Sequence, residues 1–184
     1  MSTKFTERVN VLFGQLQSES HWQKKELKRN EFLKTEGSVD TNIYYILSGC
    51  LRIYTYIGDT EYTIRFGYKD NLIAALDSFL TGKASDMCIQ AIRQTKVMVM
   101  KKQVFDQYML ENQDALLKWN GILGHAILDL MEREQDLLIS SPIERFNRVL
   151  ARSPQLFQEV PNKYIASYLN MTPETLSRLK KKLE

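Results

Sequence analysis

Glycine and proline are separated along this chain of 184 residues. All eight glycines lie at or before Gly124, and all four prolines lie at or after Pro142. Glycine allows the tight turns of antiparallel hairpins, whereas proline fits the first position of a helix. The sequence therefore predicts two different architectures, with a boundary at residues 140–142.

The glycine-containing part has the pattern of a series of short strands. Apolar residues at helical spacing over residues 5–16 precede them and predict a helix. The strand-like segments are residues 30–33, 43–47, 51–56, 62–66, 88–92 and 97–100. Turn signals at Gly37, Gly49 and Gly58 separate the first four segments. Short antiparallel strands at this spacing favour a sandwich or jelly-roll barrel.

Residues 112–138 have the pattern of one long helix. Seven positions spaced four and three residues apart form a seam of the coiled-coil type. They are Leu116, Asn120, Leu123, Ile127, Leu130, Glu134 and Leu137. Gly121 and Gly124 lie within this helix and would let another backbone approach closely. We expect the seam to be the interface of a homodimer, and a packing face within one chain is the alternative.

The most specific pattern lies in residues 162–183. Two short helices that cross at a steep angle would share a core made of apolar residues. These residues are Ile165, Leu169, Met171, Leu176 and Leu179. Ala166 is small where the second helix must pass, and Asn170 tolerates the left-handed conformation of the turn. Thr172 is a good N-cap and Pro173 fits the next position, so the pattern predicts a helix-turn-helix.

The second of these helices has a charged outward face. The candidate DNA-binding residues are Lys163, Thr172, Glu174, Ser177, Arg178, Lys181 and Lys182. Arginine can bind guanine, glutamate can accept from cytosine, and lysines can neutralise phosphates. Residues 139–184 hold 8 basic and 4 acidic side chains, whereas residues 1–138 hold 17 and 18. This distribution favours a nucleic-acid partner, and a merely solvated helical hairpin is the alternative.

Several segments resemble the Crp/Fnr family, the relatives of the cyclic-AMP receptor protein. Residues 44–54 (Tyr-Tyr-Ile-Leu-Ser-Gly-Cys-Leu-Arg-Ile-Tyr) are similar to the family's first strand-turn-strand segment. Residues 146–150 resemble the first helix of its DNA-binding domain, and residues 173–184 resemble its recognition helix. The stretches 76–81 and 164–169 are most similar to regulators of Bacteroidetes type.

This resemblance implies an α+β fold in three parts. It implies a β-roll effector domain (jelly-roll) over residues 1–111, a dimerisation helix over 112–138 and a helix-turn-helix domain over 139–184. It also implies a homodimer that reads a two-fold site in double-stranded DNA, with RNA polymerase as a further candidate partner. The family's base-reading glutamate and arginine fall on Glu174 and Arg178, while an earlier arginine contact is lost at Pro173. The sequence ends after the recognition helix, so we expect no complete wing.

The effector loop departs from the family pattern. The candidate pocket residues are Ala74, Ala75, Leu76, Asp77, Ser85 and Asp86. The family's ribose-binding Gly-Glu pair falls on Ala74 and Ala75, and its phosphate-binding Arg-Ser pair falls on Ser85 and Asp86. An acidic group where a phosphate should bind is unfavourable. We therefore expect no cyclic-AMP binding, and we predict no cofactor.

Other functions find less support in the sequence. Cys50 and Cys88 are too few for an iron–sulfur cluster, and the only histidines, His21 and His125, give little basis for a haem. A cupin-like enzyme needs clustered histidine ligands, which residues 30–102 lack, so we expect no enzyme. No signal or membrane segment is apparent, so we expect a cytoplasmic protein. The main alternative is a ligand-sensing β-roll whose helical tail contacts proteins.

Overall fold

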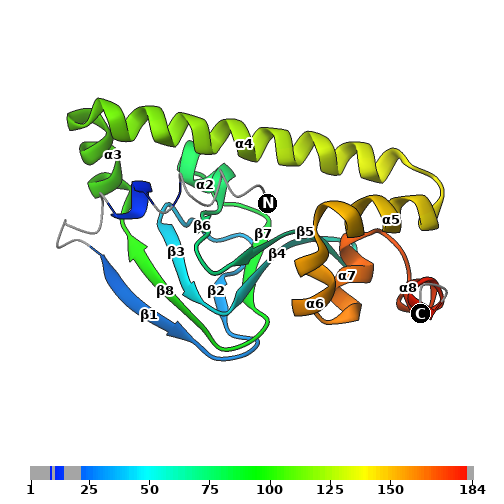
Figure 1. Cartoon of the computed structure of the whole chain (residues 1–184). Coiled ribbons are helices and arrows are strands. Elements are labelled where there is room, and N and C mark those ends of the chain that lie inside the picture. The colour runs from blue at the N-terminus through cyan, green and yellow to red at the C-terminus, as the bar shows by residue number, and fades with distance from the viewer. Residues whose placement is uncertain (1–8, 10, 15–21, 182–184) are drawn as a thin grey trace.

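The computed structural model describes residues 9, 11–14 and 22–181 (Figure 1). In it, a long helix runs along one side of a β-domain, and a group of short helices follows at the end of that helix. Of the helix predicted over residues 5–16, the described residues 9 and 11–14 are helical, and the rest lie outside the described part. Lys182 and Leu183 also lie outside it.

The β-domain consists of two four-stranded antiparallel sheets. The first has the strand order β1-β8-β3-β6 and the second β2-β7-β4-β5. The strands are β1 (Gln23–Leu27), β2 (Phe32–Lys34), β3 (Ile43–Ser48), β4 (Cys50–Ile57), β5 (Thr60–Tyr68), β6 (Leu72–Ile73), β7 (Met87–Ala91) and β8 (Thr95–Met100). The predicted sandwich is confirmed.

Apolar side chains from both sheets form the core between them. Ile46, Leu51, Ile89 and Val97 come from four different strands and are fully buried there. The predicted turn at Gly49 joins β3 to β4 with φ of +97°, and a Cβ there would lie 2.5 Å from the Gln94 carbonyl oxygen. Only glycine fits this turn without strain.

Three helices cover the first sheet. They are α2 (Leu76–Thr81), α3 (Lys102–Glu111) and α4 (Gln113–Leu138), and the bounds of α4 agree with the predicted 112–138. One face of α4 buries Ala115, Ile122 and Ala126. Phe79 of α2 and Phe105 of α3 join this second core cluster. No helix in the described part of the chain is long and apolar enough to cross a membrane.

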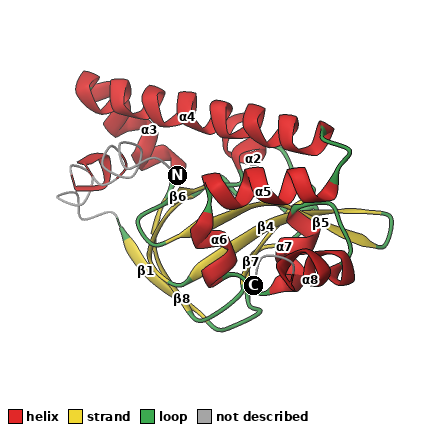
Figure 2. Ribbon diagram, turned by 45° about the vertical axis from the view of Figure 1, so that its right-hand side comes forward, coloured by secondary structure: helices red, strands yellow, loops and turns green. Residues whose placement is uncertain are grey.

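Four short helices form the C-terminal part (Figure 2). They are α5 (Pro142–Arg152), α6 (Pro154–Glu159), α7 (Asn162–Tyr168) and α8 (Pro173–Lys181). α5 begins at Pro142, at the end of the predicted boundary segment 140–142, and the Ser141 hydroxyl caps it by accepting from the Glu144 N–H. Proline also begins α6 and α8, where its missing N–H costs no hydrogen bond.

Some elements were not expected from the sequence. β1 has an exposed Gln-Lys-Lys-Glu run with no apolar alternation, and it forms because it pairs with β8 at the sheet edge. The stretch after β5, where the sequence shows no strand-like segment, contains the short β6 and the six-residue α2. Both elements are too short to show a period of their own.

Candidate functional sites

The turn between α7 and α8 has the geometry that its sequence predicts. Asn170 adopts the left-handed conformation with φ of +48°. The Met171 N–H donates to the Ala166 carbonyl at 3.0 Å across the turn. The Thr172 hydroxyl accepts from the Thr175 N–H at 3.2 Å and so caps the first turn of α8.

Apolar side chains hold α7 and α8 together. Ile165, Leu169, Leu176 and Leu179 are buried as expected, and Met171 is partly buried beside them. Ala166 is also buried, which fits the need for a small side chain there. These positions lie in a larger cluster with α5 and α6, so the two short helices are part of a packed unit.

The outward face of α8 is exposed and charged. Glu174, Ser177, Arg178 and Lys181 all point to solvent, while Lys180 is partly buried and its ammonium donates to Asn162 Oδ1 at 2.6 Å. The pKa of Glu174 is lowered, first by a hydrogen bond from its own backbone N–H and then by one from Thr172. Glu174 is therefore an ionised acceptor at neutral pH. Lys163 and Thr172 are also exposed, and Lys182 lies outside the described residues.

A buried arginine on α5 links this turn to α4. Arg145 donates to the Ile139 carbonyl at the end of α4 at 2.5 Å and to the Asn170 carbonyl at 3.2 Å. Asp136 of α4 is buried and accepts from Arg148 Nε at 2.6 Å and from Arg152. These contacts fix the C-terminal helices to the end of α4. The sequence pattern gave no sign of them, because arginines on an amphipathic helix are usually solvated.

The C-terminal helices also dock on the β4–β5 hairpin. The Ser167 hydroxyl accepts from the Thr63 N–H at 2.9 Å and donates to the Glu61 carbonyl at 2.9 Å. The fully buried Arg52 guanidinium lies 4.1 Å from the ring centre of Tyr54 and 4.4 Å from that of Tyr164 on α7. The hairpin and α7 are therefore held in a defined orientation.

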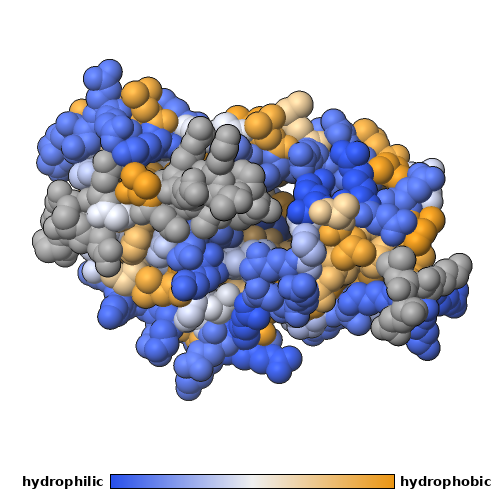
Figure 3. All heavy atoms as spheres, viewed as in Figure 1, coloured by the Kyte–Doolittle hydropathy of each residue, from blue (hydrophilic) through white to orange (hydrophobic). Residues whose placement is uncertain are grey.

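The predicted seam of α4 lies on the part of the helix that the chain itself leaves largely uncovered, together with the exposed Leu117 and Met131 beside it. Ile127 and Leu130 are 58% and 49% exposed, and Leu116 and Leu137 are exposed as well. Leu123 is half-buried, and Asn120 and Glu134 are exposed. Figure 3 shows apolar patches along the edge of the molecule that α4 occupies in Figure 1. Nothing lies within 4 Å of a Cβ added at Gly124, so a second backbone has room to approach there.

The effector loop is held by contacts within the protein. Ala75 and Ser85 are buried, while Asp86 is exposed. The Ser85 hydroxyl accepts from the Met87 N–H at 3.1 Å, and the Ser85 N–H donates to the Ser38 carbonyl at 3.1 Å. The polar groups of Ser85 are thus already occupied.

The charged side chains among the candidate pocket residues are acidic, and the nearby Lys34 is bonded within the protein. Asp86 is acidic, and the nearby ammonium of Lys34 is buried and donates to the carbonyls of Thr35, Ser85 and Met87. One carboxylate oxygen of Asp77 is buried with no hydrogen-bond partner among the described residues. Asp77 and Asp86 therefore place two carboxylates among the candidate pocket residues.

Cys50 is a buried residue of β4. Burial raises the pKa of its thiol to about 12, so the thiol is not ionised near neutral pH. Cys88 is also buried, on β7. The Cys50 thiol therefore contributes to packing and has no reactive character.

Comparison with known proteins agrees with this architecture. Residues 24–112 match the family described as cyclic nucleotide-binding domain. No curated protein matches the chain. FixK2 from Bradyrhizobium japonicum is similar in structure, with a TM-score of 0.76, 16% identity, and coverage of 88% of this chain and 84% of that one.

Two further solved structures show the same likeness. A mutant of CooA from Carboxydothermus hydrogenoformans has a TM-score of 0.74 and 18% identity over 94% of this chain and 83% of that one. The catabolite activator protein of Thermus thermophilus has a TM-score of 0.57 and 19% identity over 96% of this chain and 82% of that one. The chain thus has the fold of Crp/Fnr-type regulators and matches the cyclic nucleotide-binding domain over residues 24–112.

Proposed function

We propose that this chain is a homodimeric, DNA-binding transcription regulator of the Crp/Fnr type that does not respond to cyclic AMP. The observation that carries the proposal is the exposed charged face of α8 on a buried two-helix core. Glu174 lies in the first turn of α8, the end that enters the major groove in helix-turn-helix proteins, and Arg178 follows one turn later on the same face. We assign base contacts to them.

Phosphate contacts are assigned to exposed lysines on either side of the base-reading residues. Lys181 lies one turn beyond Arg178, and Lys163 lies at the start of α7. Thr172 and Ser177 add hydroxyl donors near the same end of α8. Lysine binds phosphate as a point charge and releases counterions, so these contacts supply affinity without sequence preference.

Dimerisation would place two such helices on one duplex. The largely exposed α4 seam supports it, because an apolar stripe left uncovered by its own chain favours a partner of the same length. An isologous interface about a two-fold axis would present two copies of α8 to a site of matching symmetry. The effector loop, with Asp86 and the already bonded Ser85, supports the absence of a cyclic-AMP response.

The proposal is tested by fluorescence anisotropy on random 30-base-pair duplexes over a series of salt concentrations. We expect the logarithm of the binding constant to fall linearly with the logarithm of salt concentration. Lys181→Ala should reduce the slope by about one for each subunit on the duplex. Lys24→Ala, an exposed lysine on β1, is the control and should leave the slope unchanged. No salt-dependent binding would favour the alternative of a protein-binding tail.

A further inference from the structure

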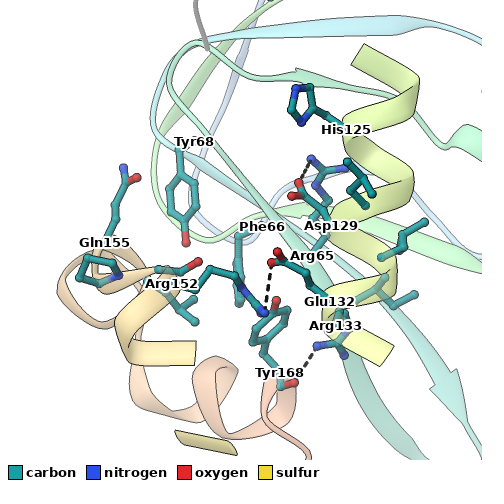
Figure 4. A pocket seen from close by; sticks show the side chains of 16 residues that line it. Arg65, Phe66, Tyr68, His125, Asp129, Glu132, Arg133, Arg152, Gln155 and Tyr168 are labelled. Carbon is teal, nitrogen blue, oxygen red and sulfur yellow. Dashed lines mark hydrogen bonds and ion pairs between the residues drawn. The ribbon is translucent and has the colours of Figure 1, made fainter. Parts of the chain in front are cut away.

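A cavity of about 700 Å³ lies where α4, β5 and the C-terminal helices meet (Figure 4). Arg65 and Phe66 line it from β5, His125 and Asp129 from α4, and Arg152 from the end of α5. Pockets of about 300–1,000 Å³ accommodate drug-sized ligands. None of the six effector-loop residues lines this cavity, so it is a separate site.

Aromatic side chains from both parts of the chain form one side of the cavity. The ring centre of Phe66 lies 5.8 Å from that of Tyr168 on α7 and 6.5 Å from that of Tyr68. Burial raises the pKa of the Tyr68 phenol, which is therefore neutral. Such rings stack on planar ligands with little loss of side-chain freedom.

Three arginines line the same cavity. Arg65 pairs with Asp129 at 3.5 Å and Arg152 with Glu132 at 3.4 Å, and both carboxylates are about half-exposed. Arg152 is also held by the buried Asp136. The Arg65–Asp129 pair is long and exposed, and a pair of this kind is weak enough for a ligand to replace the carboxylate.

The third arginine, Arg133, hydrogen-bonds to two backbone carbonyls. It donates to the Thr63 carbonyl at 2.7 Å and to the Tyr168 carbonyl at 2.9 Å, and no carboxylate of the described residues pairs with it. Its guanidinium also lies 4.2 Å from the ring centre of Tyr168. No salt bridge within the described part of the chain neutralises it, so its positive charge can attract an anion in the cavity.

The face of α4 that lines the cavity differs from the dimer seam. His125, Leu128, Asp129 and Glu132 recur at spacings of three and four residues and so lie on one face. Of the seam positions, only Leu130 also lines the cavity. A dimer formed through the seam would therefore leave the cavity open to a ligand.

We propose that this cavity binds a small aromatic acid, which is a ring system carrying one carboxylate, sulfonate or phosphate group. The ring lies against Phe66, Tyr68 and Tyr168, and the acidic group takes the place of Asp129 at Arg65. Because the walls come from the β-domain and from the C-terminal helices, the ligand holds the two parts together. The site goes beyond the proposed function, and its occupancy does not depend on DNA.

The test uses the full-length chain without DNA and the fluorescent probe 8-anilinonaphthalene-1-sulfonate. We expect saturable binding at one site per chain, and weaker binding of the uncharged analogue N-phenyl-1-naphthylamine. Arg65→Gln should weaken sulfonate binding about fivefold or more, since it removes a charge-assisted contact. Asp129→Asn should tighten it about two- to fivefold, because the competing carboxylate is gone.

Arg29→Gln, at an exposed arginine far from the cavity in sequence, is the matched control and should bind the sulfonate as the unmodified chain does. The Arg65–Asp129 pair is exposed and contributes little to stability, so we expect each variant to fold. Circular dichroism checks that it does. The proposal is overturned if Arg65→Gln binds the sulfonate like Arg29→Gln. It is also overturned if the uncharged analogue binds as tightly as the sulfonate.

Discussion

Asp136 should contribute most of the coupling between α4 and α5. Its side chain is 4% exposed and accepts from Arg148 and Arg152, whose side chains are 44% and 25% exposed. Breaking a fully buried pair costs about 3–5 kcal/mol. Here water can reach both guanidinium groups after the change, and a carboxylate near a helix C-terminus is itself unfavourable. We therefore expect Asp136→Asn to destabilise the attachment of α5 by about 2 kcal/mol.

Hydrogen exchange of the α5 amides measures this effect locally. A cost of about 2 kcal/mol corresponds to roughly thirtyfold faster exchange of those amides that exchange when α5 detaches from α4. Glu132→Gln is the matched control, because Glu132 lies one turn earlier on α4 and reaches the same Arg152 at 3.4 Å but is half-exposed. It should change stability by less than about 0.5 kcal/mol. Equal effects of the two variants would refute the argument from burial.

Three further predictions concern the seam, the loop and the docking of α7. Ile127→Glu should give a monomer by light scattering at micromolar concentration. Leu128→Glu should remain dimeric, because Leu128, although 56% exposed, points about 100° away from Ile127 around the helix axis. A monomer for both variants or for neither would contradict the assigned face. Calorimetry with cyclic AMP should give no saturable heat, and a saturable micromolar signal would contradict the assignment of the effector-loop residues or show that other residues bind it. Ser167→Ala should speed exchange of the Thr63 amide roughly tenfold, since that buried N–H loses its acceptor, and unchanged protection would show that the contact does not hold the hairpin.

Local signals in the sequence were sufficient for the long helix and for the turn between α7 and α8. The seam residues recur every three or four positions, so the bounds of α4 follow from the pattern alone. Asn170, Thr172 and Pro173 specify a left-handed residue, a cap and a helix start within four positions. Each of these choices depends on backbone geometry nearby and on little else.

Contacts between distant parts of the chain could not be predicted in this way. Ser167 and Thr63 are separated by 104 positions, and neither has a pattern that marks it as a partner. The polar β1 becomes a strand only because its backbone pairs with the free edge of β8. The cavity at Arg65 and Arg152 needs walls from three parts of the chain, so no single segment of the sequence indicates it.

The central claim is that α8 reads DNA bases, and Arg178→Ala tests it most directly. The binding of this variant is compared with that of the unmodified chain on a duplex selected from a random library and on unselected duplexes, at several salt concentrations. We predict a loss of about 1–3 kcal/mol on the selected duplex and little change on the unselected ones. Equal weakening on both kinds of duplex would contradict the account and would place Arg178 among the phosphate contacts.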